Sequence, residues 1–178
     1  MIAGTGAAAL LVVLAAGPAA AKTVPPDEWA ESVCSAAVDW AEALGEAGQA
    51  FDEAETPEEA ADALDDAVAD TRTLVKAGRR AGTPDVDGGK DSARAFVAVF
   101  KDARGILEDA RAEAADLPED SSDFEEGKTE IDDGLDEDFT ALDPDIQAVR
   151  TDADSELQDA LDDDSACREI FGTESDEQ

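Results

Sequence analysis

Apolar side chains recur every three or four residues along most of this chain, which is the spacing of one face of an α-helix. The first such stretch has apolar residues at Trp29, Val33, Ala37, Trp40, Leu44, Ala47 and Phe51. Pro25-Pro26-Asp27 precedes it, and Asp27 is of a residue type that caps helices. The pattern therefore predicts a first helix from about Asp27 to Phe51, with Cys34 beside its apolar face.

The clearest helix start in the sequence is Thr56-Pro57-Glu58-Glu59. Thr56 can cap the helix, Pro57 suits its first position, and Glu59 completes a capping box. The apolar face continues through Ala60, Leu64, Ala67, Thr71 and Leu74. We expect this second helix to stop at Ala81-Gly82-Thr83-Pro84, where Gly82 can adopt the left-handed conformation.

The same spacing predicts three further helices. The third runs from about Ser92 to Asp116 and ends before Pro118. The fourth begins at Ser121 or Ser122 and carries Phe124, Ile131, Leu135, Phe139 and Leu142. We expect Asp143-Pro144 to break or kink the chain. The fifth helix presents Ile146, Val149, Ala153, Leu157, Ala160 and Leu161, and its apolar face continues in phase to Cys167 and Phe171.

No segment shows the alternation of a β-strand. The pattern therefore predicts an all-α fold, namely a single-domain bundle of about four to five amphipathic helices over residues 22–171. Residues 172–178 are polar and acidic, and we expect them to form a flexible tail.

The N-terminus carries an apolar run from Ala7 to Gly17, followed by Pro18 and Ala19-Ala20-Ala21. A short apolar segment that ends in small residues indicates a secretory signal peptide, so we predict a signal over residues 1–21 with cleavage before Lys22. No Lys or Arg precedes the run, so either the signal is atypical or the true start lies upstream. An uncleaved membrane anchor is the alternative, although the run is short for a span of about 20 residues.

The chain has 47 acidic against 13 basic residues among 178, which gives a net charge of −34. This charge argues against binding to nucleic acid, whose phosphates need basic contacts, and against anionic membrane surfaces. It suits a basic or cationic partner in the envelope or outside the cell. The alternative interpretation is a solvated acidic surface that serves solubility.

The chain has no histidine, which excludes catalysis by Ser-His-Asp or Cys-His groups and zinc sites that use imidazole. It also excludes the Glu-x-x-His ligands of di-iron bundles. Acid/base catalysis by carboxylates alone stays formally possible, but no pair of acids stands out. We therefore expect no enzyme activity, no catalytic residue and no cofactor.

Two stretches raise the question of calcium. Thr83 to Gly88 resembles part of a calcium loop, but Arg94 occupies the twelfth position, where a bidentate Glu is needed. Two acidic runs can attract divalent cations weakly, and they comprise Glu130, Asp132, Asp133, Asp136, Glu137 and Asp138, and Asp162-Asp163-Asp164. Solvated helix faces explain both runs equally well, so we predict no defined metal site.

Two cysteines in a short chain with an export signal indicate a disulfide. We predict that Cys34 and Cys167 form it and thereby close the bundle from its N-terminus to its C-terminus. In the chain-entropy model a loop of this length stabilises the fold by somewhat more than about 4 kcal/mol. Two separate free thiols are the alternative.

The Ala-rich leader, Cys34-Ser-Ala-Ala-Val-Asp-Trp40, the Thr56-Pro57-Glu58-Glu59 start and the final Ala166-Cys167 resemble small exported helical proteins of high-GC Gram-positive bacteria. The resemblance covers the whole chain and implies a secreted or cell-envelope bundle with an end-to-end disulfide. Those proteins are largely uncharacterised, so the resemblance implies no activity and no functional residue.

These observations favour a non-enzymatic binding module, secreted or in the cell envelope, that binds a basic or cationic partner through an acidic helical surface. Two alternatives stay open. One is a structural spacer at the cell surface without a ligand, and the other is weak divalent-cation binding by the acidic runs.

Overall fold

A computed structural model describes residues 22–119 and 121–171 of the chain. Within these residues the chain forms six helices and two short strands. In chain order they are β1 (Thr23–Val24), α1 (Pro26–Glu53), α2 (Pro57–Ala81), β2 (Thr83–Pro84), α3 (Gly89–Ala115), α4 (Ser121–Thr151), α5 (Ser155–Asp163) and α6 (Ser165–Phe171). The predicted signal peptide, residues 1–21, and the predicted tail, residues 172–178, lie outside the described residues.

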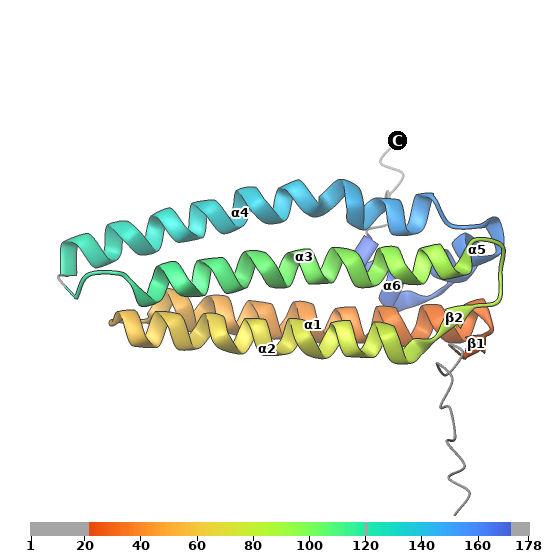
Figure 1. The fold of residues 1–178 in the computed structure, drawn as a ribbon, viewed down its shortest axis with the longest axis horizontal. Helices are drawn as coiled ribbons and strands as arrows, with labels where there is room; N and C mark the ends of the chain where they lie inside the picture. Colours follow the sequence, from red (N-terminus) through yellow and green to blue (C-terminus); the bar gives the residue numbers. More distant parts are fainter. Residues whose placement is uncertain (1–21, 120, 172–178) are drawn as a thin grey trace, which may run out of the picture.

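The four long helices run alternately up and down the long axis of the molecule, and each packs against the next (Figure 1). The short helices α5 and α6 pack against α1 and also contact α4, at the end of the bundle where β1 and β2 lie. The predicted all-α bundle is therefore confirmed. None of the helices in the described ranges combines the length and the apolar character that a membrane span requires.

The start of α2 follows the sequence signal closely. Thr56 Oγ1 accepts a hydrogen bond of 3.2 Å from the backbone N–H of Glu59, as a capping residue should. The Glu59 carboxylate accepts a bond of 2.9 Å from the N–H of Glu55, one residue before the cap. The predicted cap of the first helix is wrong, because α1 begins at Pro26 without a side-chain cap and Asp27 lies in its first turn.

The two strands were not expected from the sequence. β1 and β2 pair in parallel, with Thr23 beside Thr83 and Val24 beside Pro84. Gly82 precedes β2 with φ of 90° and ψ of −148°, so it has a positive φ but not the left-handed helical conformation that we predicted. A Cβ at this position would lie 2.3 Å from the carbonyl oxygen of Lys22. Glycine is therefore required both by φ and by the approach of the preceding chain.

The predicted helix boundary at Pro144 is wrong. Pro144 lies within α4, which continues to Thr151. Pro144 and Thr140 are both exposed, so water can satisfy the Thr140 carbonyl that the missing proline N–H leaves free. The chain turns instead at Asp154 and Asp164, whose carboxylates accept bonds of 3.0 Å from the N–H groups of Glu156 and Cys167. The predicted fifth helix is thus divided among the end of α4, α5 and α6, and the described residues form six helices where four to five were predicted.

Two apolar clusters follow one another along the bundle. The first, which we call the aromatic cluster, includes Trp29, Phe96, Phe100 and Phe171 beside the two cysteines. Trp29 and Phe100 each form ring contacts with Phe96, at centroid distances of 5.9 and 4.8 Å. The second, the alanine cluster, lies toward the α1–α2 turn, and eight of its fourteen buried residues are alanine: Ala47, Ala54, Ala60, Ala61, Ala63, Ala67, Ala110 and Ala114.

Cys34 and Cys167 are joined by a disulfide, which confirms the predicted pairing. The bond links α1 to α6 across a sequence separation of 133 residues. It is not an N-to-C-terminal closure, because Cys34 lies in the third turn of α1 and α6 continues beyond Cys167 to Phe171. The bridge fixes the small C-terminal helices onto the first helix, which the helical phase of the sequence does not specify.

Candidate functional site on the acidic face of α1 and α2

The disulfide is buried in the aromatic cluster. Its residues are 1% and 0% exposed, and neither cysteine is free. The carboxylate of Asp164 lies within 4.8 Å of both sulfur atoms. Because the sulfurs are bonded to each other and the carboxylate accepts the N–H of Cys167, this group of residues acts as a covalent link and a helix cap.

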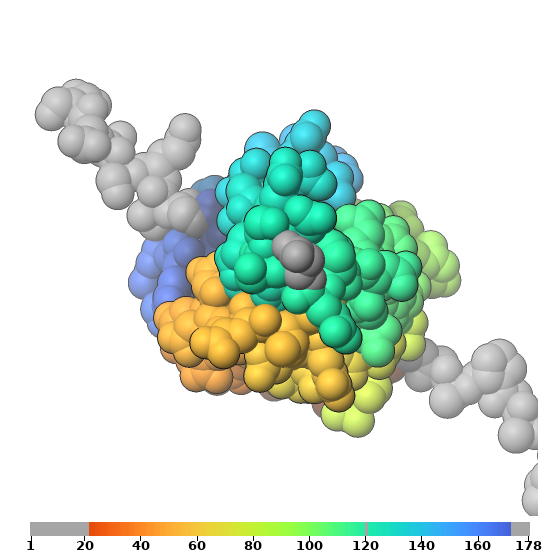
Figure 2. Space-filling view, turned by 90° about the vertical axis from the view of Figure 1, so that its left-hand side faces the viewer, coloured from red at the N-terminus to blue at the C-terminus, as the bar shows by residue number. Residues whose placement is uncertain are grey.

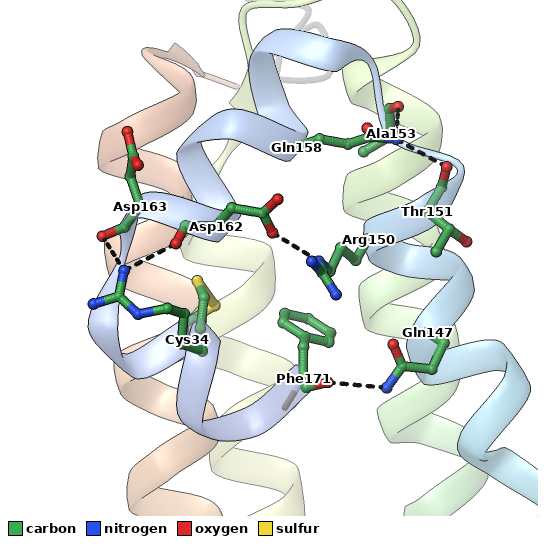
Figure 3. A network of polar contacts seen from close by, with 11 residues as sticks. Cys34, Gln147, Arg150, Thr151, Ala153, Gln158, Asp162, Asp163 and Phe171 are labelled. Atoms are coloured by element: carbon green, nitrogen blue, oxygen red, sulfur yellow. Dashed lines mark hydrogen bonds and ion pairs between the residues drawn. A yellow bond between two sulfur atoms is a disulfide. The ribbon is translucent and has the colours of Figure 1, made fainter. Parts of the chain in front are cut away.

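Polar contacts hold the small helices against α4 near this bridge (Figure 3). Arg150 Nε donates to Asp162 Oδ1 at 2.7 Å, and Gln147 Nε2 donates to the carbonyl oxygen of Phe171 at 3.2 Å. Gln158 Nε2 donates to the carbonyls of Thr151 and Ala153. These side chains all serve the packing of α4, α5 and α6, so this end of the molecule is a structural region.

The acidic runs predicted as weak cation sites do not gather into a chelating group. Among the described residues, no three carboxylates place oxygens within 4.8 Å of one another. The pKa of Asp132, in the first acidic run, is raised. Partial burial is the largest cause, and the carboxylates of Asp136, Asp52 and Asp133 add to it. The loop at Thr83 to Gly88 forms β2 and leads into α3, and Asp85 and Asp87 are exposed.

One side of α2 faces α3, and its charges are paired. Arg72 Nη2 lies 2.8 Å from Glu108 Oε1, and Arg104 Nε lies 3.4 Å from the same oxygen. Arg111 Nε lies 2.9 Å from Asp65 Oδ1. The hydrogen bond from Arg72, with both arginine charges, lowers the pKa of Glu108 although burial opposes the shift. Two ion pairs therefore join α2 to α3, Arg72 with Glu108 and Asp65 with Arg111, whereas Arg104 pairs with Glu108 along α3 itself.

Another side of α2 faces α1, and its carboxylates form no ion pair with a described residue. A cleft of about 430 Å³ lies between the two helices near their turn, lined by Glu53, Glu55, Glu59, Asp62, Asp66 and three alanines. A second cleft of about 650 Å³ adjoins it where the α1–α2 turn meets the α3–α4 connection. Glu55 and Asp62 line both clefts, and Glu58 and Glu119 add to the second. Figure 2 looks at this end, with the turn in orange and yellow below the start of α4 in teal.

A third, smaller cleft lies farther along the same pair of helices. Its volume is about 110 Å³, and it is lined by Asp39, Trp40 and Asp70 together with alanines, Leu74 and Thr73. The Trp40 side chain is half-buried. Its Nε1 donates to Thr71 Oγ1 at 2.8 Å, and its ring meets that of Phe100 edge to face at 5.0 Å. The indole that lines the cleft is therefore held in one orientation.

The five ion pairs formed among the described residues involve none of the carboxylates that line these three clefts. No described Lys or Arg lines them either. We call the surface that the three clefts occupy the acidic face. Because its carboxylates form no ion pair with a described residue and its surface is hollowed, it is the best candidate for a binding site among the described residues.

One residue that fixes the end of α1 next to this face was not predicted from the sequence. Lys128 of α4 is only 7% exposed, and its Nζ donates to the backbone carbonyls of Asp52 and Ala54 at 2.8 and 2.9 Å. Its ammonium also lies 5.8 and 5.4 Å from the ring centroids of Phe51 and Phe124. These carbonyls belong to the end of α1, where a cation is favoured. Lys128 follows Phe124 by four residues and precedes Ile131 by three, so the helical spacing could have indicated its burial.

Comparison of the chain with protein-family models, with curated proteins and with solved structures finds no match.

Proposed function

We propose that this protein is a non-enzymatic binding module that captures a basic partner on its acidic face. The observation that carries the proposal is the contrast between the two sides of α2. The side toward α3 forms ion pairs between Arg72 and Glu108 and between Asp65 and Arg111, whereas the side toward α1 carries carboxylates without a described ion-pair partner.

The acidic face offers more than a diffuse charge. Its clefts near the turn measure about 430 and 650 Å³, and alanine, proline and leucine side chains lie between the carboxylates. Side chains of Lys and Arg combine an apolar stem with a charged head, so they can bury the stem against such residues while the charge meets a carboxylate. A basic polypeptide fits this mixture better than a small inorganic cation.

The proposal places the protein outside the cytoplasm, either secreted or in the cell envelope. A buried disulfide persists in oxidising compartments, and Cys34 and Cys167 form one. Outside the cytoplasm, nucleic acids do not compete with the acidic face for basic polypeptides.

A titration with an oligolysine peptide tests the proposal. The variant Glu53→Gln, Glu55→Gln, Asp62→Asn, Asp66→Asn removes four carboxylates of the acidic face. We expect micromolar binding by the wild type at low ionic strength that weakens as salt is added, and a loss of at least about tenfold in this variant.

The matched control removes four exposed acids of α4 instead, through Asp133→Asn, Asp136→Asn, Glu137→Gln and Asp138→Asn. This variant carries the same net charge as the first, so it separates a local site from overall charge. An equal loss of oligolysine affinity in both variants would show that binding depends on overall charge and not on the acidic face. No binding by the wild type at low salt would contradict the proposal and favour a spacer without a ligand.

A further inference from the structure

Two of the three clefts of the acidic face lie between α1 and α2. The cleft near the turn brings Glu53 of α1 beside Glu59 of α2, and the cleft at Trp40 brings Asp39 of α1 beside Asp70 of α2. The two helices are antiparallel neighbours, so both clefts occupy the same groove. On the α1 side, Ala50 lines the cleft near the turn and Ala43 lines the cleft at Trp40. Their small side chains leave room for the backbone of a partner to approach the groove.

The cleft at Trp40 has the chemistry of a pocket for one cationic side chain. Its volume of about 110 Å³ is well below the range of about 300–1,000 Å³ that is typical of small-molecule sites. Asp39 and Asp70 stand at its rim, and the fixed indole of Trp40 forms part of its wall. An ammonium or guanidinium group there would meet two carboxylates and an aromatic ring, and both kinds of contact attract a cation.

The distance between the two clefts follows from the helix. Asp39 and Glu53 are separated by fourteen positions on α1, which corresponds to a rise of about 21 Å at about 1.5 Å per residue. A single flexible cation cannot occupy both clefts. A partner segment that fills both must therefore present basic side chains about four helical turns apart if it is itself a helix.

We propose that the groove between α1 and α2 binds an amphipathic helix of a basic partner, with one cationic side chain in the Trp40 cleft and another near the α1–α2 turn. This inference rests on the proposed function and makes it specific, because it names the form of the partner and the spacing of its charges.

The hydrogen-bonding groups that the groove offers indicate whether a bound partner segment is a helix or an extended peptide. An extended peptide gains affinity by pairing its N–H and C=O groups with an exposed sheet edge. The groove is formed by the side chains of two helices, whose backbone groups already bond within each helix. The backbone N–H and C=O groups of an extended peptide would find no hydrogen-bond partners along the alanines of the groove. A helix bonds these groups within itself.

The experiment uses two synthetic helical peptides of alanine, glutamine and leucine that have identical composition. One carries two lysines about four turns apart on one face, and the other carries them about two turns apart. Trp29 is buried while Trp40 lines the groove, so Trp40 fluorescence reports occupation of its cleft. We expect the long-spaced peptide to change this fluorescence, to gain helix by circular dichroism, and to bind at least about fivefold more tightly than the short-spaced one.

The variant Asp39→Asn, Asp70→Asn should weaken the long-spaced peptide about tenfold. The matched variant Glu31→Gln, Glu42→Gln removes the same charge from α1 outside the three clefts and should bind as the wild type does. Circular dichroism of each variant without peptide verifies that the fold is intact.

The outcomes separate this inference from the proposed function. If oligolysine binds the acidic face but both helical peptides bind equally, or Trp40 fluorescence does not respond, the helical partner is wrong and the proposed function stands. If neither oligolysine nor either peptide binds, both proposals fall.

Discussion

The two ends of this bundle solve the problem of a modest core in different ways. At the end with β1 and β2, large rings such as Trp29 and Phe96 pack around a covalent bond between α1 and α6. At the end with the α1–α2 turn, the buried residues are mostly alanine, and a single ammonium from Lys128 ties the end of α1 to α4. The first end combines ring packing with a covalent bond, whereas the second combines alanine packing with a buried ammonium.

This difference indicates where each task of the molecule lies. Alanine side chains allow α1 and α2 to approach closely but bury little apolar area, so the turn end gains less from the hydrophobic effect. The same small side chains leave room for the acidic clefts. The aromatic end therefore carries most of the stability, and the turn end and the α1–α2 groove offer the binding surface.

The largest expected effect comes from removing the covalent bond. The variant Cys34→Ser, Cys167→Ser frees a loop of more than a hundred residues, which should lower the free energy of unfolding by about 5 kcal/mol in the chain-entropy model. Urea denaturation measures it, and wild-type protein treated with reductant under denaturing conditions should unfold at the same midpoint. A loss below about 1 kcal/mol would mean that ring packing alone closes this end.

The next effect should appear at the opposite end. Lys128→Met keeps an unbranched side chain but leaves the carbonyls of Asp52 and Ala54 without their donor. Hydrogen bonds to a charged group contribute about 1.5–3 kcal/mol, so we expect a loss of about 2 kcal/mol.

Hydrogen exchange locates that effect. The amides near the α1–α2 turn should exchange faster in Lys128→Met, while those around Cys34 stay protected. Lys101→Met, at an exposed position of α3, is the control and should change stability by less than about 0.5 kcal/mol. Uniform loss of protection over the whole chain would show that the two ends unfold as one unit.

A smaller effect is expected on the neutralised side of α2. Glu108→Gln removes the partner of Arg72 and Arg104, and exposed pairs of this kind contribute about 0.2–1 kcal/mol. The pKa of Glu108 is lowered in the fold. Its contribution is therefore present above the ordinary glutamate pKa and is lost as the pH falls through the lowered value. Melting curves of variant and wild type should differ at neutral pH and converge in acid.

The smallest effect should have the opposite sign. The pKa of Asp132 is raised in the fold, so the folded state binds a proton more readily than the unfolded chain and loses stability as the pH rises through this window. Asp132→Asn should stabilise the protein at neutral pH by about 0.2–0.5 kcal/mol, the usual cost of like charges four residues apart on a helix. The gain should vanish below the ordinary aspartate pKa, and a loss at neutral pH would contradict the assignment.

The sequence by itself determined the helical fold, the approximate limits of α1, α2 and α3, and the cysteine pairing. The three- and four-residue spacing of apolar side chains places Trp29 and Phe51 on one face of α1, and Thr56 with Glu59 marks the start of α2, because these are local effects of backbone geometry. The absence of histidine excluded catalysis and zinc sites that need imidazole, and the net charge of −34 argued against nucleic acid as a partner.

Only the tertiary structure decided which helix face meets which neighbour. Local rules predicted a boundary at Pro144, but the exposed position of this residue lets α4 continue. The helical spacing of Lys128 to Phe124 and Ile131 could indicate its burial but not its partners, which lie 74 and 76 residues away in sequence. The acidic face depends in the same way on the register of α1 against α2 and on the ion pairs that α2 forms with α3, because neutralisation of a charge is a property of the pair.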